Sequence, residues 1–257
     1  MKYTRVQEIK QLLLHEGRVN TADLSRRFAV SIETIRRDLD ILEQEGFIRK
    51  VYGGAELNQI RDPADVMDLW STRSVVSDAE KRRIAARTLD FIPDGSTIVL
   101  DSGTTTYRLA GLLHRKKDLT VLTNSVYCAM AVSRNTNHTI YLMGGVLKKD
   151  ELITTGFLAS DFLNSFNKID LAIIGVDGFS AEEGVSDYSF EMCMIKQRFL
   201  KKSEKVIAIC DHTKFHSRSS YCSCPIEDID YLITDAGSDP EILDKVARRG
   251  VHVVIAE

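Results

Sequence analysis

Residues 31–54 are SIETIRRDLDILEQEGFIRKVYGG, a helical segment followed by a short extended one. Ser31 is a favourable helix N-cap. An apolar stripe then repeats at helical spacing through Ile35, Leu39 and Leu42. Gly46 ends the helical pattern, and residues 47–52 before a Gly-Gly pair indicate a strand, a tip and a return. The stretch therefore predicts a helix over 32–44 and then a hairpin.

Two shorter helices are predicted before this stretch. The first carries apolar residues on one face, at Val6, Ile9, Leu12 and Leu13, and ends at Gly17. The second runs over 21–28 behind the N-cap Asn20, and residues 29–30 form the turn to the third helix. Three short helices and a hairpin predict a winged helix-turn-helix, whose third helix enters the major groove of DNA.

The predicted DNA contacts lie at the start of this third helix and on the hairpin. They are Thr34, Arg36, Arg37, Arg49 and Lys50. An arginine fork matches the acceptors of guanine and of phosphate, and the wing is expected beside the sugar-phosphate backbone. The helix also carries acidic residues, expected away from the end near the DNA: Asp38, Asp40, Glu43 and Glu45. The alternative is a three-helix protein-interaction module with solvated arginines.

Charge and composition exclude several classes of protein without favouring nucleic acid. Residues 1–56 carry ten Lys/Arg and nine Asp/Glu, and the whole chain has a net charge of −3, so the DNA prediction rests on where the arginines lie. The sequence shows no apolar run long enough for a membrane span and no signal-peptide core, and its five cysteines are scattered. We expect a cytoplasmic protein with reduced thiols.

Residues from 76 onward alternate apolar runs with helical patterns. Strands are predicted at 97–100, 119–122, 139–143, 171–175, 206–210, 231–234 and 252–255, with helices between most of them. This α/β pattern predicts a mostly parallel, Rossmann-like sheet with helices on both faces. The predicted domains are 1–56, a linker over 57–75 with a short helix around 65–69, and 76–257.

Small polar residues follow the predicted strands, at the edge where ligands bind in such sheets. Together with a lysine of the helix over 190–202, the candidates are Asp101, Ser102, Gly103, Thr104, Thr105, Thr106, Thr123, Asn124, Ser125, Gly144, Gly145, Asp177, Gly178, Lys196, Asp211 and Lys214. The turn over 102–105 opens a helix, where backbone N–H groups favour an anion. Each loop alone is also explained as a turn or a cap, but together they predict a polar, anionic, hydroxyl-rich ligand.

Two other kinds of site are not expected. The sequence has no Gly-x-Gly-x-x-Gly after a strand and no phosphate loop ending in Gly-Lys-Ser/Thr, so no nucleotide cofactor is predicted. Metal-ligand residue types gather at Cys210, His212, His216, Cys222 and Cys224, but they lack the paired spacing of a zinc site.

The motifs resemble those of the DeoR-type repressors of sugar metabolism over nearly the whole chain. The resemblance lies in residues 31–39 and 46–55 of the first region and in these segments of the second: 80–82, 101–106, 123–125, 144–145, 175–178 and 211–215. It implies a repressor of a carbohydrate or polyol operon that binds double-stranded operator DNA. Because one helix-turn-helix covers only a half-site, we expect a homo-oligomer. The implied effector is a phosphorylated sugar, and the implied fold of the second domain is similar to ribose-5-phosphate isomerase. The departures from the family pattern lie mainly between the two domains and around residues 185–190.

Under this interpretation the phosphate sits on the turn over 102–105, while Asn124 and Asp177 meet sugar hydroxyls and Lys196 or Lys214 adds positive charge. The protein is then expected to have no catalytic residues. The main alternative is a sugar-phosphate isomerase with a DNA-binding appendage, for which candidate groups are Asp101, Asp177, Asp187, Glu191, Lys196 and Lys214. Against it, Ile174 stands where the isomerase resemblance suggests a second acidic residue. A DNA-binding scaffold without a ligand would leave the threonine-rich helix start unexplained.

Overall fold

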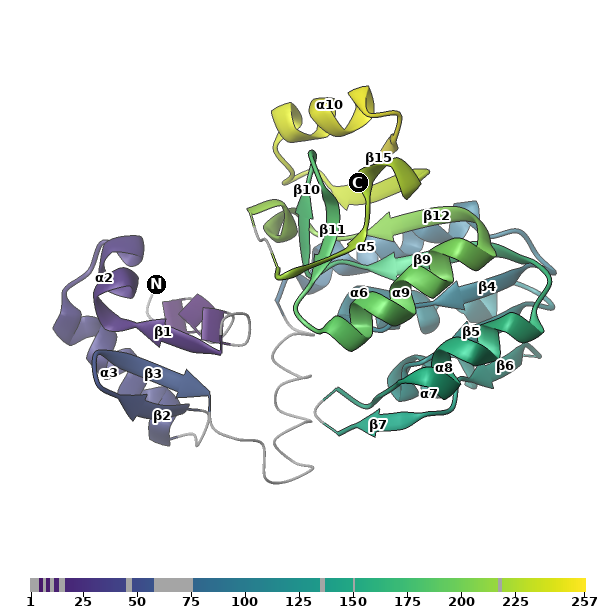
Figure 1. Ribbon diagram of the computed structural model, residues 1–257. Helices are drawn as coiled ribbons and strands as arrows, with labels where there is room; N and C mark the ends of the chain where they lie inside the picture. Colours follow the sequence, from purple (N-terminus) through teal and green to yellow (C-terminus); the bar gives the residue numbers. More distant parts are fainter. Residues whose placement is uncertain are drawn as a thin grey trace. The chain divides into compact units, whose positions relative to one another are not determined.

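The computed structural model describes residues 5–6, 8–9, 12–13, 17–44, 48–57, 76–134, 137–149, 151–216 and 219–257, the side chains of residues 44, 57 and 216 excepted. The chain divides into two compact units, Met1–Arg73 and Ser74–Glu257 (Figure 1). The linker was predicted over 57–75, and its first residue, Leu57, is the last residue described in the first unit. Its other residues, with the helix predicted around 65–69, lie outside the described ranges, as does Glu45.

The first unit has the predicted winged helix-turn-helix architecture. Its elements are β1 (Arg18–Asn20), α2 (Thr21–Phe28), α3 (Ile32–Gln44), β2 (Ile48–Val51) and β3 (Gly54–Leu57). The described residues between 5 and 13 are also helical. The three strands form an antiparallel sheet in the order β1-β3-β2, so the hairpin of β2 and β3 is extended by the short strand that precedes α2.

Local chemistry explains where these helices begin and end. Asn20 Oδ1 accepts a hydrogen bond of 2.8 Å from the N–H of Ala22, which caps α2. Ala29 then adopts a left-handed conformation, and Ser31 Oγ accepts from the N–H of Thr34 at the start of α3. The apolar stripe of α3 packs into one buried cluster with Val6, Ile9, Leu13 and Leu24. The caps therefore set the helix boundaries, and the stripe sets the packing.

The second unit is built on a seven-stranded sheet in the order β15-β14-β12-β9-β4-β5-β6, with every neighbouring pair parallel. The strands are β4 (Thr97–Leu100), β5 (Thr120–Thr123), β6 (Thr139–Leu142), β9 (Ile169–Gly175), β12 (Ser203–Ile209), β14 (Tyr231–Asp235) and β15 (His252–Ala256). Along the chain, β5 and then β6 are added on one side of β4, and β9 is afterwards added on the other side of β4. This confirms the predicted Rossmann-like sheet, and it puts the reversal of strand order between β4 and β9.

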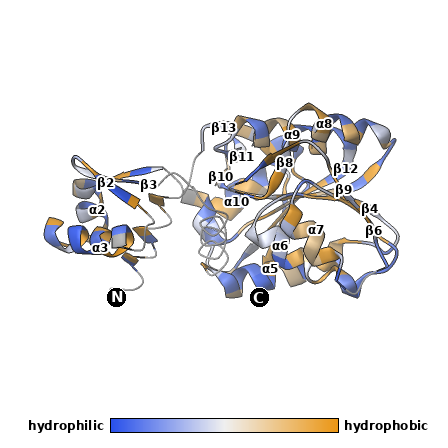
Figure 2. Ribbon diagram, turned by 90° about the horizontal axis from the view of Figure 1, so that it is seen from below, coloured by the Kyte–Doolittle hydropathy of each residue, from blue (hydrophilic) through white to orange (hydrophobic). Residues whose placement is uncertain are grey.

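Helices cover both faces of the sheet, as Figure 2 shows. On one face lie α5 (Asp78–Thr88), α6 (Thr104–Ala110) and α7 (Val126–Val132); on the other lie α8 (Phe157–Phe162) and α9 (Phe190–Lys202). Alternate residues of one strand point to opposite layers: Ile98 belongs to the buried cluster under α5 to α7, and Val99 to the cluster under α8 and α9. The latter cluster also includes apolar residues of α10 (Pro240–Arg248).

Several short antiparallel strands were not predicted. β7 (Val146–Lys148) pairs with β8 (Ile153–Thr155), and β10 (Gly178–Ser180), β11 (Gly184–Asp187) and β13 (Tyr221–Cys224) form a small separate sheet. Each has only three or four residues, which is too short for a reliable alternating pattern. Within the described ranges, no helix has the length and apolar character needed to cross a bilayer.

Candidate functional site

The predicted DNA-facing side of the first unit is the exposed start of α3. Arg36 and Arg37 are 67% and 73% exposed, and each lies 3.8–4.0 Å from a carboxylate oxygen of Glu33. Such exposed, long ion pairs are weak, so both guanidinium groups can leave Glu33 for a stronger acceptor. Thr34 is half-buried, and its hydroxyl forms a hydrogen bond with Ser31 Oγ. The predicted contacts on α3 therefore share one end of one helix.

The described acidic residues of α3 are paired within the first unit. Asp38 is buried, and its Oδ2 accepts a 2.6 Å hydrogen bond from Arg5 Nε. Asp40 and Glu43 both pair with Lys50 Nζ, and Glu56 accepts from Arg49 at 2.9 Å. The wing cations are thus partly neutralised within the unit, because their partners lie on α3 and β3. This leaves Arg36 and Arg37 as the more weakly held charges of the predicted set.

In the second unit, the reversal of strand order brings the ends of β4 and β9 side by side. Asp101 follows β4 directly and is 1% exposed, and its Oδ2 accepts a 3.0 Å hydrogen bond from the N–H of Gly175 at the end of β9. A Cβ atom on Gly175 would lie 2.8 Å from the carbonyl oxygen of Ser102, so only glycine allows this approach. The ends of β4 and β9 therefore pack tightly against each other at Asp101, on the predicted ligand-binding edge of the sheet.

Lys196 joins this edge from the middle of α9. Its ammonium group donates to the carbonyl of Gly175 at 2.8 Å and to Asp187 Oδ1 at 2.9 Å, and it lies 3.2 Å from Asp101 Oδ2. All three charged side chains are less than 5% exposed. We name Asp101, Asp187 and Lys196 the Lys196 cluster. Its members come from the end of β4, from β11 and from α9, so tertiary packing alone assembles it.

The Lys196 cluster holds more negative than positive charge. Burial raises the pKa of Asp101 and raises the pKa of Asp187 to about 6, in both cases against the attraction of Lys196. Burial alone would lower the pKa of Lys196, but Asp101, Asp187 and Asp177 outweigh it and raise that pKa. One ammonium therefore neutralises only part of the carboxylate charge, and a proton that binds Asp187 as the pH falls below about 6 relieves more of it.

Three buried oxygens at this edge accept no hydrogen bond from the described residues: Asp101 Oδ1, Asn124 Oδ1 and Asp187 Oδ2. Asn124 follows β5, the neighbour of β4, so its position lies next to that of Asp101. An unsatisfied buried acceptor costs about 1–3 kcal/mol, so native proteins rarely keep one without a function. All three atoms can accept hydrogen bonds from a ligand that supplies donors.

Asn124 is also tied to the hairpin of β7 and β8. Its Nδ2 donates to the carbonyl of Thr154 at 3.3 Å, and its own carbonyl accepts from the N–H of Thr154 at 2.8 Å. The hydroxyl of Thr154 donates to the carbonyl of Met143. Strand β8 therefore holds the side chain of Asn124 in place at the edge of the sheet.

The turn before α6 has the features of the predicted anion site. Gly103 has a φ of 140°, a conformation that strains any other residue. No side chain caps the first turn of α6, so its N–H groups lack that partner. Thr105 is 8% exposed, whereas Ser102, Gly103 and Thr104 are half-buried. These four residues remain a predicted phosphate site.

Four other predicted residues stabilise the loops themselves. Thr106 Oγ1 donates to the carbonyl of Gly103 at 2.9 Å, and Thr123 Oγ1 accepts from the N–H of Ser125 at 3.1 Å. Ser125 Oγ caps α7 by accepting from Cys128. At Gly145, a Cβ would lie 2.4 Å from the carbonyl of Thr155, so glycine lets β7 approach β8. The structure thus gives each a role in loop geometry.

The remaining predicted residues are spread over three loops. Gly144 is exposed, and Gly178 pairs with Ser186 in the small sheet. Asp177 lies near enough to the Lys196 cluster to affect its pKa values. Asp211 accepts from the N–H of Thr213 at 3.1 Å, and the half-buried Lys214 follows it.

Sequence reasoning left two buried residues out of the predicted effector site. Asp187 was considered only for the isomerase alternative, because β11 was not predicted. Lys81 of α5 is 4% exposed; its Nζ donates to the carbonyl of Val76 at 2.6 Å and lies 3.9 Å from Asp211 Oδ2. The signal for Lys81 was its spacing, since it shares the buried face of α5 with Ile84, Ala85 and Thr88. A buried lysine at this edge adds positive charge to the region.

The cysteine and histidine residues considered for a metal do not form a cluster in the part of the chain that the structure describes. No group of three or more His, Cys, Asp or Glu side chains is placed there to hold a metal ion, and the side chain of His216 lies outside that part. Burial raises the pKa of Cys210 and of Cys224, which keeps both thiols protonated.

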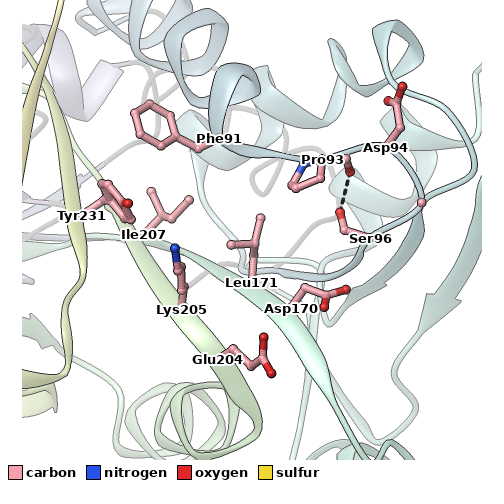
Figure 3. A pocket seen from close by; sticks show the side chains of 11 residues that line it. Phe91, Pro93, Asp94, Ser96, Asp170, Leu171, Glu204, Lys205, Ile207 and Tyr231 are labelled. Atoms are coloured by element: carbon pink, nitrogen blue, oxygen red, sulfur yellow. Dashed lines mark hydrogen bonds between the residues drawn. The ribbon is translucent and has the colours of Figure 1, made fainter.

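A hollow of about 430 Å³ lies at the opposite edge of the sheet, where β4, β9, β12 and β14 begin (Figure 3). Its polar groups already have partners: Ser96 Oγ donates to the carbonyl of Pro93, and Asp170 Oδ2 accepts from the N–H of Thr97. Lys168 also bridges Asp170 and Glu204. Ligands of such sheets bind at the carboxyl ends of the strands, so we place the candidate site at the Lys196 cluster.

Comparison with known protein families shows to which family this two-unit chain belongs. A family model described as "DeoR-like helix-turn-helix domain" matches residues 5–61, and one described as "DeoR C terminal sensor domain" matches residues 77–236. The chain belongs to the DeoR family. It is accordingly a DNA-binding transcriptional regulator, as the resemblance of its motifs implies.

Individual relatives cover almost the whole DeoR-family chain. The HTH-type transcriptional regulator GolR of Listeria innocua is 32% identical over 255 residues, which is 99% of each chain. The glycerol-3-phosphate regulon repressor of Escherichia coli K12 is 31% identical over 237 residues, 92% of each chain. A solved D-ribose-5-phosphate isomerase structure matches 54% of each chain at 17% identity with a TM-score of 0.41.

Proposed function

We propose that this DeoR-family regulator represses a carbohydrate or polyol operon and that a phosphorylated sugar or polyol controls its binding to operator DNA. The observation that carries the effector proposal is the set of three buried, unpaired acceptors beside Lys196. A relative named for the glycerol-3-phosphate regulon supports the same class of effector.

Ligand hydroxyls match these acceptors. Asp101 Oδ1, Asn124 Oδ1 and Asp187 Oδ2 require donors, and a polyol supplies several O–H groups on adjacent carbons. A fully ionised phosphate has no proton to donate, and the excess negative charge of the cluster repels it. The hydroxyl-bearing end of the effector therefore lies over the Lys196 cluster, with Asp177 as a further acceptor.

The phosphate is assigned to the turn over 102–105, away from the carboxylates of the cluster. Backbone N–H groups at the start of α6 and the hydroxyls of Thr104 and Thr105 supply donors. Lys81 and Lys214 add positive charge at the same edge of the sheet. The turn over 102–105 would thus bind the phosphate end of the effector, and the Lys196 cluster would bind its hydroxyl-bearing end.

The cluster's burial supports a sensing role. Asp101, Asn124 and Asp187 are at most 3% exposed, so a ligand that contacts them requires the surrounding loops to move. A ligand shifts a conformational equilibrium only when it binds one state more tightly than the other. The unpaired acceptors provide that difference, because they gain partners only in the ligand-bound state.

Calorimetry on the full chain tests the effector proposal, with a panel of sugar and polyol phosphates and their unphosphorylated parents. We expect one phosphorylated compound to bind at least about 100-fold more tightly than its parent, equivalent to roughly two charge-assisted hydrogen bonds. Equal affinities for the two forms would refute the phosphate assignment. Binding of no panel member would refute the effector class.

Asn124→Ala and Asn164→Ala form a matched pair for the hydroxyl contacts. Asn164 is an exposed asparagine whose Nδ2 donates to Asp161 Oδ1 at 2.9 Å. It does not belong to the predicted effector site, so its replacement serves as the control. Asn124→Ala should weaken effector binding by about tenfold, the value of one hydrogen bond, and Asn164→Ala should not. Anisotropy with an operator selected from a random duplex pool reports whether the variants still bind DNA.

We further propose that the effector is bound without conversion. Ile174, at the position where a second acidic residue is expected for isomerisation, is fully buried in the core and adds no titratable group. One observation favours the isomerase alternative: Asp187, with a pKa of about 6 beside a lysine, resembles a general base. NMR of the protein with each bound sugar phosphate over hours separates the two. Formation of an isomer that Asp187→Asn abolishes would make the protein an enzyme.

A further inference from the structure

A buried lysine holds the point at which the chain enters the second unit. Val76 is the first residue that the structure describes there, and residues 58–75 join it to the winged helix-turn-helix. The Nζ of Lys81 in α5 donates to the carbonyl of Val76 at 2.6 Å and lies 3.9 Å from Oδ2 of the buried Asp211. We name residues 76–81 the α5 joint. Lys81 therefore links the start of the unit to the loop after β12.

A second contact ties the α5 joint to α6. Asp78 Oδ1 accepts a 2.7 Å hydrogen bond from Arg108 Nε, and Arg108 lies one turn after Thr104, the first residue of α6. The two helices α5 and α6 cover the same face of the sheet (Figure 2). The predicted phosphate turn over 102–105 leads directly into α6. The joint is therefore tied to the helix that this turn opens and to the loop after β12.

Ser77 gives the joint a strained backbone. Its φ is 51° and its ψ is 37°, a left-handed conformation that residues other than glycine adopt at a cost. Its side chain forms no capping hydrogen bond with α5, so the hydroxyl does not offset that cost. A strained residue persists only where its surroundings hold it. Lys81 supplies such contacts on both sides, because its Nζ donates to the carbonyl of Val76 and its N–H donates to the carbonyl of Ser77 at 2.9 Å.

The ammonium group of Lys81 lies closer to a neutral partner than to a charged one. The carbonyl of Val76 is at hydrogen-bond distance, whereas Asp211 Oδ2, at 3.9 Å, is not. The other oxygen of this carboxylate, Asp211 Oδ1, accepts from the N–H of Thr213 at 3.1 Å. A charged donor forms a stronger hydrogen bond with an anion than with a neutral carbonyl. A phosphate bound at this edge of the sheet therefore competes with the Val76 carbonyl for Lys81.

We infer that the α5 joint is a conformational switch between the effector site and the DNA-binding unit, with Lys81 as its positioning residue. In the conformation that the structure describes, Lys81 holds the carbonyl of Val76 and the strained Ser77. A bound phosphate draws the ammonium away from that carbonyl, Ser77 relaxes, and the chain leaves the second unit in another direction. The inference rests on the proposed function for the phosphate, but the joint can be tested without a ligand.

Lys81→Met tests the joint on the full chain. Methionine is a long apolar side chain that donates no hydrogen bond to the carbonyl of Val76. Without any effector, this variant should change the affinity for the selected operator by about tenfold, a typical coupling between two sites. Arg83→Met is the matched control, because Arg83 is exposed on the same helix and pairs with Glu80; it should bind the operator like the wild type. Anisotropy titrations measure both affinities.

Glycerol 3-phosphate is the probe for the ligand-bound state, since it carries a phosphate and neighbouring hydroxyls. Inorganic phosphate at the same concentration is the anion without hydroxyls. Glycerol 3-phosphate should shift the operator affinity of the wild type in the same direction as Lys81→Met does without a ligand. This agreement in direction distinguishes a switch from a lysine that only stabilises the second unit.

Ser77→Gly and Ser77→Ala separate backbone strain from other effects of a substitution. Glycine adopts a φ of 51° without strain, whereas alanine keeps the strain and loses only the hydroxyl. Ser77→Gly should therefore favour the described conformation and raise the concentration of glycerol 3-phosphate needed for half of its effect on operator binding by at least about fivefold. Ser77→Ala should respond like the wild type.

Circular dichroism shows whether each variant is folded, and the Ser77 pair decides if Lys81→Met is not. The inference is overturned if a folded Lys81→Met binds the operator as Arg83→Met does, or if the two Ser77 variants respond alike to the probe. An operator affinity that Lys81→Met changes but neither phosphate compound changes in the wild type would support the joint and refute the proposed effector class. Equal responses to the two compounds would support the switch and contradict the hydroxyl contacts of the Lys196 cluster.

Discussion

Asp187 Oδ1 accepts a 2.9 Å hydrogen bond from Lys196 Nζ, although Asp187 ends β11 and Lys196 lies in the middle of α9. The same ammonium also lies 3.2 Å from Asp101 Oδ2. A single buried lysine therefore holds together three elements that are separate in the sequence. The stability of the second unit and the chemistry of its ligand site depend on the same charge.

Lys196→Met should destabilise the second unit by about 3–5 kcal/mol, because it leaves two buried carboxylates without their cation. Urea denaturation measures this loss. Lys201→Met, at an exposed position on the same helix, is the control and should change the free energy of unfolding little. If both variants unfold alike, the carboxylates of Asp101 and Asp187 do not depend on Lys196 for their burial.

The stability of the protein should depend on pH through Asp187. Its pKa is raised from 3.8 to about 6 by burial, so the folded state binds this proton more tightly than the unfolded state does. The resulting stabilisation is complete below about pH 4 and is lost as the pH rises through about 6. Relative to Asp187→Asn, the wild type should lose on the order of 2–3 kcal/mol of unfolding free energy across this range. Parallel denaturation curves for the two proteins at each pH would contradict the assignment.

Gly103→Ala should weaken effector binding by about tenfold or more while leaving operator binding intact. The reason is its φ of 140°, at which a side chain costs about 1–3 kcal/mol and distorts the turn. Gly111→Ala is the control on the same helix, because its φ is −66° and its added Cβ would make ordinary contacts of 3.6 Å. Calorimetry on both variants decides. Equal effector affinities would remove the turn over 102–105 from the site.

Arg36→Ala or Arg37→Ala should cost about 1–3 kcal/mol of binding to the preferred operator if the arginine contacts a base. Lys50→Ala should weaken all DNA sequences to a similar, smaller extent, because Asp40 and Glu43 already engage its ammonium group. Anisotropy titrations with the operator and a scrambled duplex at two salt concentrations distinguish these effects. Wild-type affinity in both arginine variants would exclude α3 as the recognition helix.

Local signals account for what the sequence predicts correctly. Asn20 and Ser31 fix the starts of α2 and α3 by hydrogen bonds to residues two or three positions away, and three of the four residues of β4 are apolar and consecutive, Ile98–Leu100. The same signals gave the parallel sheet and hence the edge at which the candidate residues meet. No local sequence pattern predicts that Asp187 lies beside Lys196, since their pairing depends on how α9 packs against β11.

Asp38 shows a different kind of limit. It lies three positions after Ile35 and four before Leu42, on the buried stripe of α3, so periodicity places it inward. A lone buried carboxylate is costly, so a charge at this position requires a partner. That partner is Arg5, which lies 33 residues away, and no pattern within α3 can reveal it.

Strand β8 has a further consequence. On one side it binds Asn124 through Thr154, and on the other it pairs with β7, which carries Val146 and Leu147. A metabolite that moves Asn124 would then also move this hairpin, and by thermodynamic reciprocity any contact that holds the hairpin in place would change the affinity for the metabolite by the same factor. Such a contact would thereby alter the metabolite level at which the operon responds.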